Sequence, residues 1–249
     1  MNVDFDSWPY PAWVAHRGAG KLAPENTLAA FRLGAHLGYR MFECDVKLSA
    51  DGALFLLHDD TLERTTNGAG PAGSFAWGEL SILDAGLRHS PAYAGEPIPR
   101  FDAVARWAKS NGYRLDVEIK PAAGSETETG EAVALACAAL WSDADVPPLL
   151  TSFQPQSLAA ARHAAGHLPR GLLVNEPWDG WLDAAGELGC TAVILKHTLV
   201  DPVLVRSAHA ARLRVGAYTP NDAPDVDRVR AAGVDMVVTD AVDVYSPRA

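Results

Sequence analysis

The sequence predicts an α/β protein that folds as a (β/α)8 barrel, or TIM barrel, in one domain over residues 1–249. Short, β-prone apolar runs alternate with Ala-rich amphipathic runs almost to the end of the chain, a pattern typical of a parallel sheet with crossover helices. Eight such units fit a chain of 249 residues, the usual size of this barrel. A doubly wound open sheet is the alternative fold, but it usually has fewer strands.

The expected strands are short apolar runs bounded by turn residues. They cover Trp13–His16, Met41–Leu48, Leu54–His58, Leu115–Lys120, Leu149–Ser152, Gly171–Val174, Ala192–Leu195, Arg214–Tyr218 and Met236–Thr239. The expected helices are the amphipathic runs near residues 26–38, 101–111, 128–142, 155–165, 179–188, 202–212 and 224–232. One of the nine strands is therefore surplus to an eight-stranded barrel.

The surplus strand is the run Leu54–His58. It follows the strand that ends at Leu48 after five residues, and these contain Asp51-Gly52, a strong hairpin signal. A parallel crossover needs a dozen residues or more. We therefore expect an antiparallel hairpin strand, with eight parallel strands left for the barrel.

The segment 59–100 interrupts the alternation. It contains no clean strand pattern and is rich in Gly and Pro, including Asn67-Gly68 and Gly70-Pro71. Long irregular segments inside a compact domain are usually functional or disordered. We expect a small inserted cap or lid after the hairpin strand.

The composition narrows the class of protein. The chain has 21 Lys and Arg against 31 Asp and Glu, a net charge of −10, which argues against a nucleic-acid partner. A small anionic substrate is still compatible, because a few cations in one cleft can outweigh the global charge. Three cysteines without metal-binding spacing, and an N-terminus unlike a signal peptide, favour the cytoplasm. No run approaches the roughly 18 apolar residues of a membrane span, so we expect no stable membrane insertion; homo-oligomer formation is left open.

Polar residues gather where the barrel strands end, which is where active sites lie in this fold. Glu43 and Asp45 are two residues apart on one strand and so face the same side, and Glu118 and Lys120 repeat this spacing. Three acids in one barrel mouth stay ionised only with a cation among them, and oxygen ligands suit Mg²⁺, Mn²⁺ or Ca²⁺. The structural alternative is salt bridges to Arg17, Lys47 or Lys120.

Two histidines end strands beside these acids. His16 and His58 titrate near neutral pH and suit acid–base work, although one such histidine alone is more often structural. Arg17 and Lys120 supply fixed positive charge for phosphate oxygens. The combination indicates metal-assisted phosphoryl transfer.

The motifs, taken together, resemble the glycerophosphodiester phosphodiesterase family. They are His16-Arg17-Gly18, Pro24-Glu25-Asn26-Thr27, Glu43-Cys44-Asp45, Asp51-Gly52, His58-Asp59 and Glu118-Ile119-Lys120, in an order that extends over nearly the whole chain. GKLAPENTLAA and FLLHDDTLERT are most similar to the bacterial cytoplasmic branch linked to glycerol-3-phosphate uptake.

The resemblance implies hydrolysis of glycerophosphodiesters to sn-glycerol 3-phosphate and an alcohol, within glycerol and lipid metabolism. It implies one divalent cation, Mg²⁺ before Ca²⁺ or Mn²⁺, held by Glu43, Asp45 and Glu118. It further implies that His16 and His58 act as acid and base, that Arg17 and Lys120 contact the phosphate, and that 59–100 covers the glycerol end of the substrate.

Two positions depart from the family pattern. Tyr218 stands where the family often has Trp, and Gln154 follows Ser152-Phe153 where Asp or Asn is common. We expect Tyr218 at the substrate-binding wall, so the departures concern substrate detail rather than the reaction.

Several alternatives stay open from the sequence. The nucleophile is either the glycerol 2-hydroxyl, giving a cyclic phosphate, or water. A lysophospholipase D or a lyase would share the architecture, and a binding module without turnover is the rival from another class. Asn26 or Thr27 is the expected N-cap of the first helix, and Glu25 has either a structural or a site role.

Overall fold

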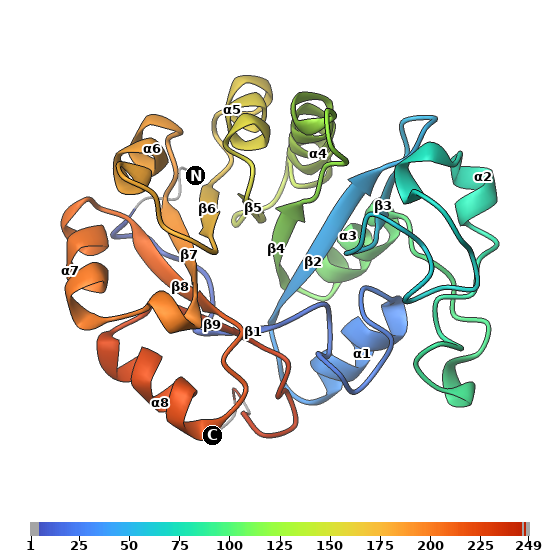
Figure 1. Ribbon diagram of the computed structural model, residues 1–249, viewed down its shortest axis with the longest axis horizontal. Coiled ribbons are helices and arrows are strands. Elements are labelled where there is room, and N and C mark those ends of the chain that lie inside the picture. Colours follow the sequence, from blue (N-terminus) through green and yellow to red (C-terminus); the bar gives the residue numbers. More distant parts are fainter. Residues whose placement is uncertain (1–4, 246, 248–249) are drawn as a thin grey trace.

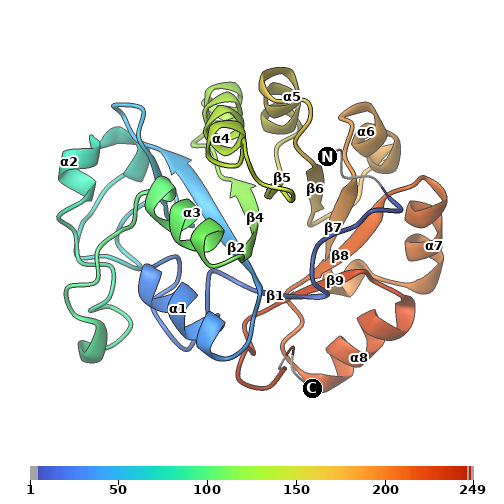
Figure 2. The same ribbon diagram turned by 180° about the vertical axis from the view of Figure 1, so that it is seen from behind.

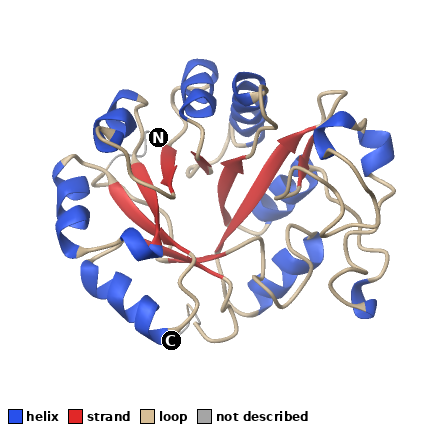
Figure 3. Ribbon diagram, in the orientation of Figure 1, coloured by secondary structure: helices blue, strands red, loops and turns tan. Residues whose placement is uncertain are grey.

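A computed structural model of the chain, which describes residues 5–245 and 247, shows the predicted barrel (Figure 1). Eight parallel strands close in the order β1-β2-β4-β5-β6-β7-β8-β9, with β9 paired back to β1. The inner ring of strands is surrounded by helices (Figure 3). The extra strand β3 pairs antiparallel with β2, as the Asp51-Gly52 turn predicts.

The strand bounds are close to those expected from the apolar runs. The strands are β1 Trp13–Ala15, β2 Met41–Leu48, β3 Leu54–Leu56, β4 Arg114–Ile119, β5 Leu149–Ser152, β6 Arg170–Val174, β7 Ala192–Lys196, β8 Arg214–Tyr218 and β9 Met236–Thr239. The outer helices are α1 Leu28–His36, α3 Phe101–Ser110, α4 Glu126–Leu140, α5 Pro155–Ala164, α6 Trp181–Glu187, α7 Pro202–Ala210 and α8 Ala223–Ala232. The short 3₁₀-helix η3 covers His197–Leu199.

Strand β2 has two partners along one edge. Near the N-terminal end of β2, Phe42 pairs with Ala15 of β1, which is the one position where these two strands pair. At the C-terminal end of β2, Val46–Leu48 pair with β3. The strands that precede the two histidines therefore end early. We expected His16 and His58 as the last residues of their strands, but β1 ends at Ala15 and β3 ends at Leu56. Both histidines lie in the loops that follow these two strands.

The barrel strands are buried on both faces. The outward side chains Cys44, Val117 and Ile119 are at most 1% exposed and pack into a core shared with helix residues, as their alternation with the acids predicts. The inward side chains near the N-terminal end of the barrel form a second core, which Tyr10 joins. The N-terminal segment crosses this end of the barrel (Figure 2), and the Tyr10 hydroxyl donates to the carbonyl of Pro147 at 2.9 Å. The functional end is therefore the opposite one.

Residues 59–100 lie beside β3 and outside the ring of barrel helices in both views (Figures 1 and 2). This segment contains only short helices, η1 Ala72–Ser74, α2 Trp77–Leu80 and η2 Pro91–Tyr93, and isolated bridges. It has a small apolar core separate from that of the barrel, formed with Phe55 and Leu57 by Leu62, Leu80 and Ile98. Its internal order thus comes from side-chain packing rather than from a sheet.

Within residues 5–245 and 247, the structure contains no helix that is both long and apolar enough to cross a membrane. The three cysteines, Cys44, Cys137 and Cys190, are free and buried.

Candidate active site

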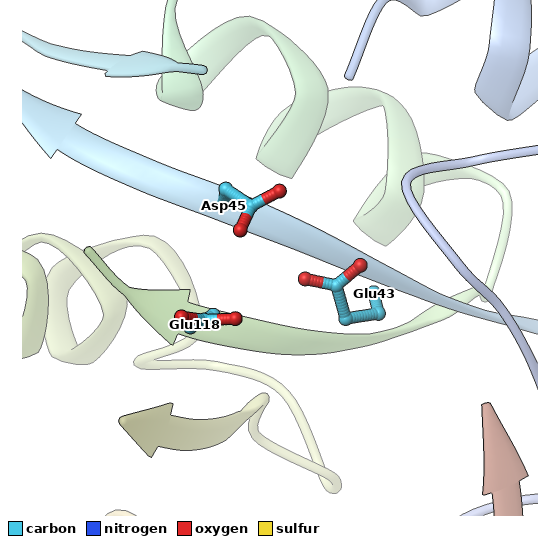
Figure 4. A group of neighbouring side chains, drawn as sticks. All are labelled: Glu43, Asp45 and Glu118. Atoms are coloured by element: carbon cyan, nitrogen blue, oxygen red, sulfur yellow. The ribbon is translucent and has the colours of Figure 1, made fainter. Parts of the chain in front are cut away.

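Three carboxylates meet inside the barrel mouth. Glu43 and Asp45 project from β2, and Glu118 projects from the neighbouring β4 (Figure 4). Asp45 lies directly opposite Glu118 in the β2–β4 ladder, and Glu43 is two residues further down on the same face. One oxygen of each carboxylate lies within 4.8 Å of one oxygen of each of the others. The parallel register thus brings together the acids that the two-residue spacing predicts.

Two cations lie against this cluster. The Lys120 ammonium is 2.8 Å from Glu118 Oε1 and 3.5 Å from Asp45 Oδ1, and the Arg17 guanidinium is 3.3 Å from Asp45 Oδ2. Lys47 is directed elsewhere and pairs with Asp60 at 2.8 Å. The structural alternative of salt bridges therefore holds for part of the cluster only, since two cations face three acids.

The acids differ in how well they are compensated. Burial, together with the charges of Asp45 and Glu118, raises the pKa of Glu43 well above its ordinary value. Burial and Asp45 likewise raise the pKa of Glu118 to about 7. Burial also acts to raise the pKa of Asp45, but Arg17 and Lys120 outweigh it and the pKa is lowered.

Two oxygens of the cluster are buried without a hydrogen bond, Glu43 Oε1 and Asp45 Oδ1. Buried polar atoms in proteins are almost always hydrogen-bonded; Asp45 Oδ1 has the Lys120 ammonium at 3.5 Å instead, and both oxygens can take a further ligand. An all-oxygen donor set suits a hard divalent cation. The residues present therefore fit the expected metal.

His16 follows β1 and is held by Asp240, which follows β9. His16 Nδ1 lies 2.6 Å from Asp240 Oδ1, and the Asn221 side chain donates to the other oxygen of Asp240 at 3.0 Å. Because a carboxylate only accepts hydrogen bonds, Nδ1 is the donor. The other ring nitrogen, Nε2, lies 3.8 Å from Glu43 Oε2. The ring therefore presents Nε2 to the acid cluster.

His58 is also held by a carboxylate, that of the next residue, Asp59. Its Nδ1 lies 2.7 Å from Asp59 Oδ1, so this ring also donates from Nδ1 and has Nε2 free for proton transfer. Burial lowers the pKa of His58, although Asp45 and Asp59 act against it. The two histidines thus form two imidazole–carboxylate pairs from different parts of the chain.

A strained turn places Arg17. The residue has φ 49°, in the left-handed region, a conformation that is costly for a non-glycine residue. Two bonds hold it: the Arg17 amide donates to Glu43 Oε2 at 2.9 Å, and the Asn26 amide donates to the Arg17 carbonyl at 3.0 Å. Gly18 continues the turn with φ 98°, and a Cβ there would lie 2.8 Å from the backbone nitrogen of Phe31.

The start of the first helix serves both structure and site. Thr27 is the N-cap of α1, as one of the two expected alternatives, and its hydroxyl accepts from the Ala30 amide. Asn26 has φ 59°, and it exchanges two hydrogen bonds with Asp45, at 2.8 and 3.1 Å. Glu25 accepts from Arg17 at 2.9 Å, so it belongs to the surroundings of the site.

These residues enclose a cavity of about 170 Å³ whose two sides differ. One side carries ionisable residues from the first strands and is called the charged wall; it consists of His16, Arg17, Glu43, His58, Asp116, Glu118 and Lys120. The opposite side is called the apolar wall; it consists of Phe153, Leu173, Ile194, Tyr218 and Val238. Tyr218, expected at the substrate-binding wall, lies on this side, and its hydroxyl is 3.3 Å from the carbonyl of Val174. Seven of the eight expected site residues therefore line one cavity, and the eighth, Asp45, lies behind them in contact with Arg17 and Lys120.

The sequence reasoning missed one acid of the charged wall. Asp116 is 1% exposed, and burial raises its pKa to about 7 although the Thr151 hydroxyl donates to it at 2.7 Å. The signal that could have found it is the same two-residue spacing, because Asp116 precedes Glu118 by two positions. Asp59, the partner of His58, entered the sequence analysis only as part of the motif His58-Asp59.

Comparison with known proteins shows which family the chain resembles. Residues 16–244 match the Glycerophosphoryl diester phosphodiesterase family. YhdW of Bacillus subtilis is 34% identical over 236 residues, which cover 92% of this chain and 94% of that protein. The glycerophosphodiester phosphodiesterase of Caldanaerobacter subterraneus is 32% identical over 231 residues, 91% of this chain and 93% of that enzyme.

The fold and the sequence agree with a solved structure as well. A phosphodiesterase of Oleispira antarctica, in complex with the product sn-glycerol-3-phosphate, is 32% identical, with a TM-score of 0.87 over 94% of each chain. The resemblance inferred from the motifs is confirmed over most of the chain, and the bacterial relatives are consistent with the expected bacterial branch. This chain therefore belongs to the glycerophosphoryl diester phosphodiesterase family.

Proposed function

We propose that this protein hydrolyses glycerophosphodiesters to sn-glycerol 3-phosphate and an alcohol, in a metal-dependent reaction with two-histidine acid–base catalysis. The observation that carries the proposal is the cluster of Glu43, Asp45 and Glu118, of which Glu43 and Glu118 line the same cavity as His16 and His58. The bound sn-glycerol-3-phosphate of the Oleispira antarctica phosphodiesterase supports the proposed product class.

Glu43, Asp45 and Glu118 would hold the divalent cation, Mg²⁺ before Ca²⁺ or Mn²⁺. Such an ion, when bound, neutralises phosphate oxygens and stabilises the charge that develops at phosphorus. The raised pKa values of Glu43 and Glu118 support this role, because they mark negative charge that the protein leaves uncompensated.

The two histidines would move the protons. One Nε2 removes the proton of the attacking hydroxyl as its oxygen bonds to phosphorus, and the other Nε2 protonates the alcohol oxygen as its bond to phosphorus breaks. Asp240 and Asp59 keep each Nδ1 protonated, so each Nε2 is available. Either histidine can be the base in this arrangement, and the nucleophile is the glycerol 2-hydroxyl or water.

The remaining site residues would bind the substrate. Arg17 and Lys120 are the cations nearest the acid cluster and would contact the phosphate. The apolar wall, with Tyr218, would take the carbon skeleton of the substrate, because apolar side chains pack against carbon without a desolvation cost.

The remaining predictions on organisation are also kept as proposals. The chain would form one barrel domain, with 59–100 as an inserted cap; the separate small core of this segment supports that description. A cytoplasmic location is supported by three free, buried cysteines. The charge of −10 supports the absence of a nucleic-acid partner.

The test is release of glycerol 3-phosphate from glycerophosphocholine and glycerophosphoethanolamine. The protein is treated with EDTA, and Mg²⁺, Mn²⁺ or Ca²⁺ is then restored. Release that depends on the metal, from both substrates, is the expected result. Release that is unchanged in EDTA would contradict the metal site, and no release with any metal would contradict the activity and favour a lysophospholipid substrate or a binding module.

A further inference from the structure

Arg64 joins two carboxylates at the edge of the candidate active site. Its Nε and NH2 groups donate to the two oxygens of Asp59 at 2.6 and 2.9 Å. Its NH1 and NH2 groups donate to the two oxygens of Glu25, both at 2.7 Å. The guanidinium thus makes two bidentate pairs and uses four of its five N–H groups, which is the geometry that the planar fork of Arg favours.

Each of these carboxylates makes a further bond to a residue of the charged wall. Asp59 Oδ1 holds His58 Nδ1 at 2.7 Å, and Glu25 Oε1 accepts from Arg17 at 2.9 Å. Arg64 itself is not among the residues that line the cavity. It is therefore one residue removed from a proposed catalytic histidine on one side and from a proposed phosphate-binding arginine on the other.

Arg64 links the two loops directly through Glu25, and both loops are also bonded to Asp45 of β2, the first through Asn26 and the second through Leu57. Within the described part of the chain, no backbone hydrogen bond links residues 16–27 to residues 54–66. The reason lies in the sheet, since β1 leaves β2 after Ala15 and the free upper edge of β2 is taken by β3. Two further bonds tie residues beyond Arg64 to the first loop and its helix: His89 Nε2 bonds to the carbonyl of Lys21, and the amide of Ala29 donates to the Glu96 carboxylate.

We propose that Arg64 is a positioning residue of the active site, which fixes His58 through Asp59 and Arg17 through Glu25 in one common geometry. This inference rests on the proposed two-histidine reaction. Misplacement of a reacting group by about 1 Å can cost roughly 10²-fold in rate. The Arg64 side chain is 48% exposed, so solvent screens its ion pairs and limits what they add to the stability of the fold. Its removal should therefore reduce activity far more than stability.

The experiment compares Arg64→Ala, Arg64→Lys and a matched control, Arg88→Ala. Arg88 lies in the same segment as Arg64 and lines the same surface pocket, but among the described residues its Nε donates to the carbonyl of Thr66 and to no carboxylate. Arg64→Ala should lower kcat roughly 10²-fold, with a nearly unchanged melting temperature. Arg64→Lys should stay well below the parent, because an ammonium is a point charge that cannot bind both carboxylates bidentately. Arg88→Ala should match the parent.

Chemical rescue separates positioning from a merely structural role. Millimolar guanidinium should restore part of the kcat of Arg64→Ala, while methylammonium should not. In the parent, nitrogen-15 NMR should show His58 protonated at Nδ1, and this signal should change in Arg64→Ala and not in Arg88→Ala. An unchanged kcat in Arg64→Ala, or a loss that guanidinium leaves untouched, would overturn the inference. A parent protein without hydrolase activity would instead refute the proposed function. The NMR comparison would then still test whether Arg64 positions His58.

Discussion

The charged wall and the apolar wall of the cavity are built by the same kind of parallel strand, yet they bury opposite chemistry. β2 and β4 direct Glu43, Asp45 and Glu118 inward. β6 and β7 place Leu173 and Ile194 on the apolar wall of the same cavity. The fold tolerates both, because the outward face of either half is apolar and packs against helices.

The two walls differ in what they contribute to the stability of the fold. The charged wall carries buried carboxylates at raised pKa and orphaned oxygens, which oppose folding. The apolar wall, in contrast, gains stability from burial like any core. The proposed catalytic residues and this cost in stability are thus concentrated in the first half of the barrel, and changes to the two walls should affect different measured quantities.

The largest effect is expected from the histidines of the charged wall. His16→Gln and His58→Gln should each lower kcat roughly 10²–10⁴-fold, the range for loss of a general acid or base, with little change in substrate binding. Glycerol 3-phosphate release with metal present measures this. His163→Gln, on the exposed face of α5, is the control and should be as active as the parent. Full activity in both active-site variants would refute two-histidine catalysis.

Much of this division could be predicted from the sequence. Alternation of β-prone and Ala-rich runs gave the barrel, and the two-residue spacing gave Glu43, Asp45, Glu118 and Lys120 one common face. The expected strands over Met41–Leu48 and Arg214–Tyr218 have the bounds that the structure shows. The local pattern suffices there because the interior residues of each strand are buried.

What could not be predicted depends on contacts between distant segments. The early ends of β1 and β3 follow from how the edge of β2 is shared, which no local pattern contains. Asn26 has the signature of a helix cap, but its side chain holds Asp45. Leu173 and Ile194 look like ordinary core residues, because an apolar side chain carries no mark of the cavity it faces.

The next effect concerns the pair that orients His16. Asp240→Asn should lower kcat roughly 10²-fold, because the amide can donate to Nδ1 and so favour the imidazole tautomer with its proton on Nε2. The variant keeps the shape of the side chain, so the melting temperature should change little. Asp243→Asn, an exposed neighbour, serves as the control. Equal kcat values in the two variants would show that the His16–Asp240 bond does not matter for turnover.

A smaller effect is expected on the apolar wall. Leu173→Ala should lower kcat/KM by roughly tenfold, mainly through KM, because apolar contacts with a substrate are worth about 1–3 kcal/mol. Leu172→Ala is the matched control, since this neighbour faces the helices and is fully buried. It should cost about 2–5 kcal/mol of unfolding free energy and leave KM unchanged. A larger KM in Leu172→Ala than in Leu173→Ala would show that the apolar wall does not bind substrate.

The smallest expected effect is on how the stability of the protein depends on pH through Glu118 of the charged wall. Glu118 has a pKa of about 7 in the folded protein, above its ordinary 4.5, so the folded state retains a proton that the unfolded state has released between these values. Stability therefore falls as pH rises through this window. Glu118→Gln lacks this titrating proton. Without metal, the melting temperature of the variant minus that of the parent should therefore increase by a few degrees from pH 5 to pH 8, at about 2–4 °C per kcal/mol. Restored Mg²⁺ should raise the melting temperature of the parent more than that of the variant, because the variant lacks one proposed ligand. If the melting temperature of the variant instead falls relative to that of the parent as pH rises in EDTA, the charge of Glu118 is already compensated by Lys120 alone. The charged wall would then need no cation at this position.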